Sequence, residues 1–193
     1  MSAEIELHAD QIVAAAVDIL RESGLDAVSM RSVAGRLGVT PPPVYARIGN
    51  KSALLDAVAD HFLSDLAPPL QRDERWPDYA RRWTAQLRQR LTEAADSRLF
   101  LQVKRPAYLE ASRPLLKCMR RDGMDTDHAV RACRLLTWAT VGFVAMDHPP
   151  ASGTAGRRNR LAGSDPDGVS ADEVDELFTA HIEYLIDGIR RDS

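Results

Sequence analysis

The sequence predicts an all-α protein with a helix-turn-helix near its amino terminus. Apolar residues recur mostly three and four positions apart rather than two, which is the spacing of amphipathic helices. The 193 residues are 45% hydrophobic, which is enough to bury a substantial core. Glycines and runs of proline separate the periodic stretches and mark breaks between helices. The proline pair at 68–69 marks the expected boundary between an amino-terminal domain, 1–67, and a second domain, 68–193.

A first helix is expected over residues 8–23. The apolar side chains of Ile12, Ala16 and Leu20 recur four positions apart and form a stripe that faces the core. Gly24 follows directly and ends the helix, because glycine takes the backbone conformations that stop one.

Two short helices joined at a glycine follow, and they form the predicted helix-turn-helix. Ser29 is a preferred N-cap residue and begins the first of them. Gly38 ends it, because a glycine just past the last turn takes the left-handed conformation. Thr40 is expected to cap the second helix, in which Val44 and Ile48 recur at helical spacing and face the core.

Three consecutive prolines, Pro41, Pro42 and Pro43, stand at the start of this second helix. Proline suits a first helical turn, but the residue before a proline is driven away from helical geometry. We therefore expect the helix to begin near Pro43. Its outward face then carries Tyr45 and Arg47, and the prolines leave it with fewer hydrogen bonds to bases than a polar first turn would make.

The helix-turn-helix is a local basic patch in a slightly acidic chain. The formal net charge is −3 at pH 7, yet residues 29–51 hold four of the five basic residues in 1–67 and no acidic residue. Clustered positive charge is typical of a surface that faces the phosphates of nucleic acid. Two helices joined at a glycine also occur as ordinary solvated pairs in all-helical proteins, so the patch alone leaves both interpretations open.

Residues 19–63 resemble the DNA-binding domain of the tetracycline-repressor (TetR) family of bacterial regulators. The resemblance lies in the order of these features: Gly24, Ser29-x-Arg31, Ala34, Leu37-Gly38-Val39, Val44-Tyr45 and Asn50-Lys51-x-x-Leu54-Leu55. It implies a three-helix DNA-binding domain that a fourth helix joins to a carboxy-terminal helical domain for ligand binding and dimerisation. A weaker similarity continues at Arg105-Pro106, at 142–144 and in the last helix.

The rest of the chain is expected to be helical around one long loop. The fourth helix is capped by Asn50 and stops at Pro68-Pro69, and further helices are predicted over 76–95, 106–121 and 127–146 and after a cap at Ser170. Pro114 is expected to kink or restart the helix that contains it. Residues 149–170 are rich in Gly, Ser, Pro, Asp and Arg and predict a loop. Its basic segment, 156–160, is expected to be solvated, with a contact to DNA as the alternative.

Two of these helices carry a large apolar surface. The helix over 127–146 has no charge between Arg134 and Asp147, and the last helix presents a wide apolar face. The apolar residues of that face that we expect at the surface between subunits are Leu177, Phe178, Ile182 and Leu185. The resemblance implies that both helices pair with their copies in a second subunit, which gives a homodimer. The alternative is that both helices fill the core of one chain.

The candidate DNA contacts divide into base readers and phosphate anchors. Arg31 and Arg47 are the base-reading candidates, because a guanidinium can bridge O6 and N7 of guanine. Lys51, Tyr45 and Ser29 are expected to hold phosphates. The second helix of the helix-turn-helix is the expected recognition helix. The turn before it and its first residues complete the set of candidates, which are Thr40, Pro41, Pro42 and Pro43.

A small-molecule pocket is expected between the helices of the carboxy-terminal domain. Its candidate lining residues, each of which can equally be ordinary core, are Trp83, Phe100, Arg105, Tyr108, Met119 and Trp138. Arg105 is the expected polar anchor, because the resemblance places its turn near the pocket. No histidine lies between Ser97 and Glu110, where tetracycline-responsive members hold a metal-chelated drug, so the resemblance implies a different inducer.

The sequence contains no motif for covalent chemistry. It lacks a G-x-S-x-G elbow, an H-E-x-x-H zinc helix, a phosphate-binding loop and a dinucleotide fingerprint. The five histidines are scattered, and Cys118 and Cys133 fit small core residues better than redox or metal sites. We therefore expect no enzyme activity, no metal and no cofactor. Two cysteines, the lack of a signal peptide and the lack of an apolar run near the roughly 20 residues of a membrane span lead us to expect a cytoplasmic protein.

The expected function is that of a ligand-responsive, DNA-binding transcriptional regulator. The resemblance implies a repressor that binds a palindromic double-stranded DNA operator as a homodimer and is released by a small-molecule effector. The alternative is a regulator without an effector, or an activator, and an enzyme is a remote third interpretation.

Overall fold

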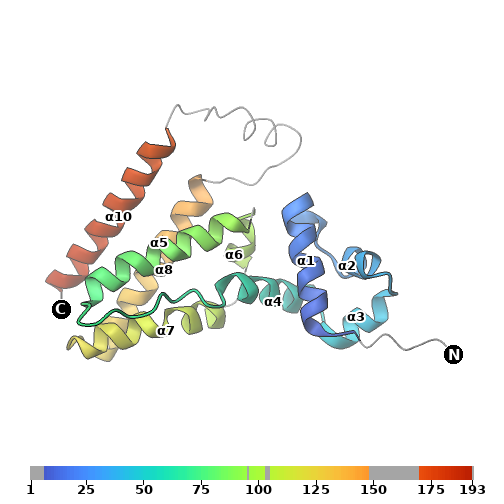
Figure 1. Ribbon diagram of the computed structural model, residues 1–193, viewed down its shortest axis with the longest axis horizontal. Helices are drawn as coiled ribbons and strands as arrows, with labels where there is room; N and C mark the ends of the chain where they lie inside the picture. Colours follow the sequence, from blue (N-terminus) through green and yellow to red (C-terminus); the bar gives the residue numbers. More distant parts are fainter. Residues whose placement is uncertain (1–6, 95, 103–104, 148–169, 193) are drawn as a thin grey trace.

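The structure, a computed structural model, describes residues 7–94, 96–102, 105–147 and 170–192. Within these ranges every regular element is helical, which confirms the predicted all-α fold. Figure 1 shows an elongated molecule with the first three helices of the chain grouped at one end and the later helices at the other. A single helix, α4, runs between the two groups.

The bounds of the helices agree with the sequence patterns over most of the chain. In chain order they are α1 (Ala9–Ser23), the 3-10 turn η1 (Leu25–Ala27), α2 (Met30–Leu37), α3 (Pro41–Ile48), α4 (Lys51–Leu63), α5 (Trp76–Glu93), α6 (Arg98–Gln102), α7 (Arg105–Arg121), α8 (Thr126–Asp147) and α10 (Ala171–Arg191). The predicted ends of α1, α5, α7 and α8 lie within two residues of these bounds. Helix α6 was not expected, because five residues are too few to show helical periodicity.

The fourth helix begins as expected and ends early. The Asn50 side chain accepts a hydrogen bond from the Ala53 amide at 3.0 Å and so caps α4. The predicted stop at Pro68-Pro69 is wrong, because the helix ends at Leu63. Asp65, two residues on, takes the left-handed conformation with φ of 53°, which turns the chain before it reaches the prolines.

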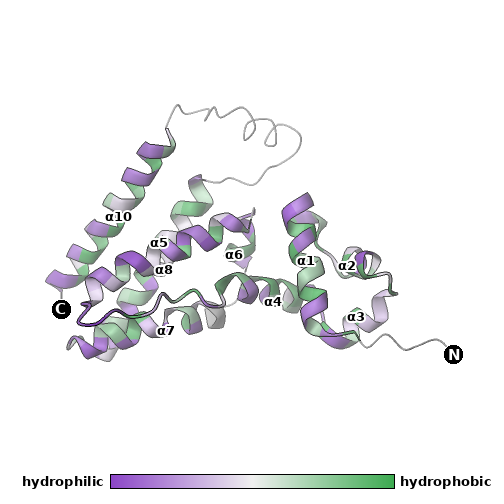
Figure 2. Cartoon of the chain, in the orientation of Figure 1, coloured by the Kyte–Doolittle hydropathy of each residue, from purple (hydrophilic) through white to green (hydrophobic). Residues whose placement is uncertain are grey.

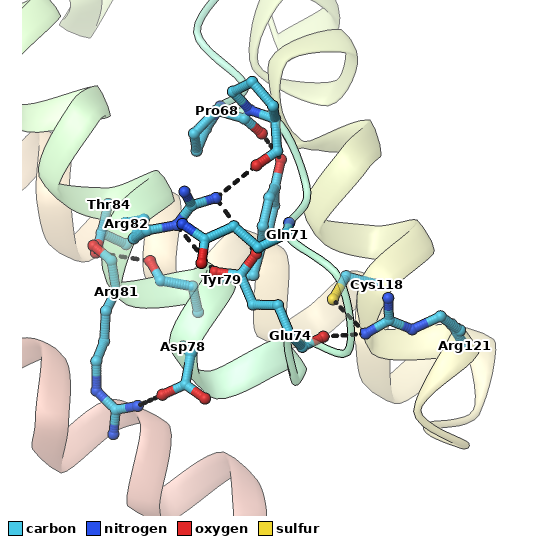
Figure 3. Close-up of polar contacts among 12 residues, drawn as sticks. Pro68, Gln71, Glu74, Asp78, Tyr79, Arg81, Arg82, Thr84, Cys118 and Arg121 are labelled. Atoms are coloured by element: carbon cyan, nitrogen blue, oxygen red, sulfur yellow. Dashed lines mark hydrogen bonds and ion pairs between the residues drawn. The ribbon is translucent and has the colours of Figure 1, made fainter.

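A linker, residues 64–75, leads from α4 to α5 and is held by polar contacts (Figure 3). The Tyr79 hydroxyl and the Arg82 guanidinium donate to the backbone carbonyls of the linker's two prolines, at 3.0 and 2.7 Å. Arg82 also donates to the buried Glu74 carboxylate at 2.9 Å, and Arg121 donates to the Glu74 carbonyl. These contacts fix the linker against α5 and α7, and with it the end of α4.

The carboxy-terminal body is built around α5 and α8, which contact each other and also α7 and α10. Its largest fully buried side chains include Trp83, Leu87, Met119 and Leu136. Helix α7 continues through Pro114, so the expected restart at this proline does not occur. The apolar core of the body is continuous with that of the amino-terminal helices, because the buried apolar residues form one cluster.

Helix α8 is long and apolar enough to cross a membrane by length and composition alone. The sequence expectation concerned an unbroken apolar run, and this helix is interrupted by Arg131 and Arg134. Helix α8 contacts α5, α7 and α10, and Ala132, Leu136 and Thr140 on it are almost completely buried inside the chain. This packing is that of the core helix of a bundle, and such a helix passes the same compositional test.

Helix α10 begins at the predicted cap and carries alternating polar and apolar strips along its length (Figure 2). The Ser170 hydroxyl accepts a hydrogen bond from the Glu173 amide at 3.2 Å. The rest of the predicted loop, 149–169 with its basic segment 156–160, lies outside the described residues.

The prediction that Phe178 and Ile182 of α10 belong to an interface between subunits is wrong. Both are buried within the chain, at 5% and 3% exposure, because α10 packs against α5 and α8. Leu185 is half-buried, and Leu177 is exposed. The apolar face of α10 is thus wide enough to have one sector inside the chain and another on the surface.

A buried carboxylate joins the amino-terminal helices to the body. Asp96 lies between α5 and α6, and its Oδ2 accepts a hydrogen bond from the Leu25 amide of η1 at 3.0 Å. Arg98 donates to the carboxylates of both Asp96 and Asp26, at 2.8 and 3.0 Å. We call these four residues, Asp96, Arg98, Leu25 and Asp26, the latch.

The surroundings of Asp96 favour its charged form. Burial alone would raise the pKa of this carboxyl, but hydrogen bonds from the Arg98 guanidinium and from the Leu25 and Arg98 amides outweigh it and lower the pKa. Because the folded-state pKa lies below the unfolded one, this contribution to stability is present near neutral pH and is lost as the pH falls through the folded-state pKa.

We expect Asp96→Ala to lower the free energy of unfolding by about 2 kcal/mol, because it leaves the buried Leu25 amide without an acceptor. Asp96→Asn keeps an acceptor and should cost less, while losing the acid-sensitive part of the stability. Urea denaturation at pH 7 and at acid pH measures both effects. Asp187→Ala is the matched control, because this carboxylate on α10 is 56% exposed and pairs with Arg190 only at 3.9 Å. Equal losses for Asp96→Ala and Asp187→Ala would contradict a role for the latch.

Candidate nucleic-acid interface

The helix-turn-helix is fixed by its buried side and its turn. Val33, Ala34 and Val44 are at most 1% exposed and hold α2 and α3 against the core. Gly38 lies in the left-handed region, with φ of 68° and ψ of 24°, as the sequence predicts. The Val39 amide then donates to the Ala34 carbonyl at 3.0 Å, which closes the end of α2 and sets the direction of α3.

Two hydroxyl groups cap the start of α2. The Ser29 hydroxyl accepts a hydrogen bond from the Ser32 amide at 3.0 Å, and the Ser32 hydroxyl accepts one from the Ser29 amide at 2.9 Å. Ser32 also donates to the Ala27 carbonyl at 2.7 Å. The capping role of Ser32 was not among the predictions, although a hydroxyl residue three positions after an N-cap serine is the signal for such a reciprocal cap. The predicted phosphate contact of Ser29 thus involves a hydroxyl that already caps a helix.

Helix α3 begins at Pro41, so the expected start near Pro43 is wrong. The prolines fill the first three positions of the helix, where an N–H would have no partner within the helix, and their fixed φ suits that turn. The Thr40 side chain makes no capping hydrogen bond. The reason is chemical, because Pro42 and Pro43 offer no N–H for its hydroxyl to accept.

The predicted contact residues lie close together on α2, α3 and the start of α4, at one end of the molecule (Figure 1). Those with exposed side chains are Arg31, Thr40, Pro42, Pro43, Tyr45, Arg47 and Lys51, while Ser29 and Pro41 are half-buried. Tyr45 is 49% exposed. The structure therefore presents this set on one surface, and whether that surface contacts DNA stays a prediction.

The basic patch is smaller than the sequence suggests. Arg36 of α2 forms ion pairs with Asp18 and Glu22 of α1. Its hydrogen bond lowers the pKa of Glu22, and the same contact raises the pKa of Arg36. One of the four basic residues in 29–51 is thereby used to hold α1 against α2.

Arg47 is also engaged within the chain. Its Nε donates to the Leu7 carbonyl at 2.8 Å, which holds the start of the described chain beside α3. To read a base with its full guanidinium, Arg47 would have to give up this bond. By contrast, Arg31 and Lys51 form no ion pair or hydrogen bond through their side chains with any described residue.

Residues 12–58, from α1 into α4, match the family model of the bacterial regulatory proteins of the tetR family. This chain belongs to the TetR family. The tetracycline repressor protein class A from transposon 1721 of Escherichia coli is 26% identical over 199 residues, which cover 96% of this chain and 92% of that protein. The HTH-type transcriptional repressor BdcR of Escherichia coli is 36% identical over 69 residues, which cover 34% of this chain and 35% of that protein.

Solved structures match nearly the whole length of the chain. A TetR variant from Acinetobacter baumannii AYE in complex with minocycline has a TM-score of 0.75 at 25% identity and covers 96% of this chain and 98% of its own. BioQ of Mycobacterium smegmatis has a TM-score of 0.76 at 26% identity, with 97% and 100% covered. ActR of Streptomyces coelicolor, at 24% identity and a TM-score of 0.78 over 97% and 96% of the two chains, supports the fold. The chain is therefore a transcriptional regulator of the TetR family, and its curated relatives are regulators rather than enzymes.

The predicted ligand residues of this TetR protein lie in different surroundings. Trp83, Phe100 and Met119 are at most 3% exposed and belong to the core, where the Trp83 indole donates to the Ala111 carbonyl at 3.0 Å. Trp138 is 59% exposed on the outer side of α8. The side chain of Arg105, the first residue of α7, lies outside the described part of the chain.

Tyr108, the remaining candidate, is tied down at the start of α7. Its hydroxyl donates to the Phe100 carbonyl at 2.7 Å, and burial raises the pKa of this phenol. It thereby joins α6 to α7 and fills space between them. The pocket lined by these six residues thus stays a prediction: three of the six lie in the core, Trp138 lies on the surface, and Tyr108 bridges two helices.

Two surface hollows are present in the described part of the chain. The first, of about 570 Å³, lies where α4, the linker and α7 meet, and its lining residues are Asp60, Leu63, Ser64, Asp65, Leu66, Ala67, Glu110 and Ala111. The second, of about 370 Å³, lies between α5 and α10 and includes Arg81, Arg88 and Phe178. Neither is lined by the residues predicted for a ligand.

Two glycines of α2 and its turn offer a paired test of the helix-turn-helix. Gly38→Ala should lower the free energy of unfolding by about 1–2 kcal/mol, because the left-handed conformation at φ of 68° strains any residue with a Cβ. Gly35→Ala should raise it by up to about 1 kcal/mol, because a Cβ in the helix interior at this position meets no atom within 4 Å. Chemical denaturation of the two variants measures this difference, and changes of the same sign would contradict the assigned turn.

Proposed function

We propose that this TetR-family chain is a repressor that binds a palindromic DNA operator as a homodimer and leaves it when a small molecule binds to the body. The proposal rests on two separate exposed surfaces that occur on the same chain. One is the basic and apolar face of α2, α3 and the start of α4, and the other is an apolar stripe on α8 and α10. In this proposal residues 1–67 bind DNA and residues 68–193 bind the ligand and the second subunit, in the cytoplasm.

The apolar stripe consists of five large exposed side chains. They are Leu135, Trp138 and Met146 on α8 and Leu177 and Tyr184 on α10, with exposures of 47%, 59%, 85%, 52% and 77%. Their spacing of three, seven and eight positions places them on one side of each helix. A second copy that presents the same stripe would cover all of them in a four-helix contact. Gly142 and Gly188, beside which a Cβ would meet no atom within 4 Å, allow the helices to approach closely.

Operator recognition by a helix-turn-helix protein needs a two-fold arrangement, which the proposed dimer would supply. Two recognition helices related by a two-fold axis enter successive major grooves about 34–36 Å apart. The phosphate contacts of the two half-sites then add, since the copies are linked. A palindromic operator follows from the two-fold symmetry of the protein.

The route for a ligand signal runs through α4 and the latch. The hollow of about 570 Å³ has the size of a drug-like site and is bounded by α4, the linker and α7. The solved relative bound to minocycline supports a small-molecule effector for this chain too. A ligand there releases DNA only if it binds the DNA-free arrangement more tightly than the DNA-bound one.

The DNA-binding part of the proposal is tested by the salt dependence of binding. Lys51→Ala should weaken binding to every duplex and reduce the slope of log K against log salt by about one unit per half-site, because one phosphate contact is lost in each. Lys117→Ala removes the same charge from an exposed site on α7 in the body and serves as the control. Fluorescence anisotropy at several salt concentrations gives both slopes. Equal slopes for the two variants would exclude Lys51 from the interface.

The dimer is tested by sedimentation equilibrium. We expect the wild-type chain to be a dimer at micromolar concentration and Trp138→Asp to be a folded monomer, because the carboxylate would have to be buried between subunits. Leu70→Asp, at a linker side chain that is 48% exposed, should leave the dimer intact. A wild-type chain that sediments as a monomer would overturn the stripe as an interface and the palindromic operator with it.

A further inference from the structure

The centre of the outward face of α3 has no hydrogen-bonding side chain. At 3.6 residues per turn, Pro42 and Ala46 lie almost opposite Val44, which is completely buried. Pro43 and Tyr45 flank them, and all four outward residues are exposed. A pyrrolidine ring and a methyl group neither donate nor accept a hydrogen bond, so whatever meets the middle of this face meets hydrocarbon.

The backbone at the start of α3 is equally short of donors. In most helices the first N–H groups are unpaired and point outward, which is why helix starts bind phosphates. Here the first three positions are Pro41, Pro42 and Pro43, and none has an N–H. The start of α3 therefore offers neither an anion site nor a backbone contact to a base edge.

The polar groups near α3 lie at its margins. Arg47 projects to the side and donates through Nε to the Leu7 carbonyl at 2.8 Å. Thr40 precedes the helix, and the Tyr45 hydroxyl is at the tip of a long side chain. Arg31 and Lys51, whose side chains pair with no residue that the structure describes, belong to α2 and α4.

We propose that α3 recognises the methyl groups of thymine, through Pro42 and Ala46. Thymine is the one base that presents a methyl group in the major groove, and apolar side chains recognise it by contact. This inference rests on the proposed function and names the operator chemistry that the recognition helix takes: a half-site with thymines under the middle of α3. Lys51 and the start of α4 hold the phosphates, and Arg47 is a positioning residue that fixes α3 beside the amino terminus.

The proposal is tested with DNA in which single thymines are replaced by deoxyuridine. The tightest duplexes are first selected from a random library with the wild-type protein, and each thymine of the half-site is then replaced in turn. Deoxyuridine pairs as thymine does and lacks only the methyl group. Burial of one methyl group predicts about a fourfold loss of affinity per contacted half-site position, and no loss at thymines outside the half-site.

A variant identifies the side chain that makes the contact. Pro42→Gln places a side chain that can pair with adenine at the second position of α3. In this variant the deoxyuridine penalty at one thymine should fall from about fourfold to less than twofold. Pro77→Gln makes the same change at the second position of α5, away from α3, and should leave the penalty unchanged. Circular dichroism melting confirms that both variants are folded.

The outcomes separate this inference from the proposed function. Loss of affinity with deoxyuridine at specific half-site positions, abolished by Pro42→Gln and not by Pro77→Gln, supports it. Tight, selective binding that is insensitive to every deoxyuridine, or selected half-sites without thymine, overturns the inference and leaves the regulator intact. A protein that selects no sequence at all overturns the proposed function itself.

Discussion

The arrangement of the whole chain depends on how the amino-terminal helices are held against the body, and in the described part of the chain a buried carboxylate, Asp96, makes such a contact outside α4. Asp96 is 5% exposed, yet it is charged, because the Leu25 amide and Arg98 satisfy it. A buried charge is costly unless such partners are in place, so the contact has strict geometry. A displacement of Asp96 with α6 must therefore move η1 or break these bonds, and η1 leads directly into α2.

The far end of α4 is constrained in a different way. The linker is bound to α5 and α7 through the carbonyls of its prolines and through Glu74, so the end of α4 moves with the body. The hollow at this junction is lined by both α4 and α7. A ligand that separates α4 and α7 or draws them together would tilt α4. The latch, which holds η1 to the body, would then resist the tilt or pass it on to α2.

Local patterns predicted most of the helix bounds, though not α6, the start of α3 or the end of α4, and they did not predict the contacts that orient the helices. The caps at Ser29, Asn50 and Ser170 and the turn at Gly38 involve residues within five positions of one another, and all were predictable. The bonds of Arg36, Arg47 and Asp96 join residues 14, 40 and 71 positions apart, and no local spacing encodes them. Periodicity likewise showed that the apolar face of α10 is wide, but not that Phe178 and Ile182 are covered by the chain's own α5 and α8.

Reading methyl groups would make the position of α3 unusually important. Dispersion contacts are individually weak, and a gap of about 0.5–1 Å already forfeits a quarter to a half of each one, whereas a charged hydrogen bond to a flexible arginine tolerates more movement. The chain restrains α3 accordingly: three prolines fix φ through its first turn, Gly38 sets its direction, and Arg47 ties it to Leu7. In such an interface a ligand that shifts the recognition helix by much less than the length of one helical turn removes the contacts that give specificity. The apolar face of α3 and the latch thus serve the same purpose. Contacts that are lost over so short a distance can be controlled by a ligand only if the chain transmits small displacements to α3.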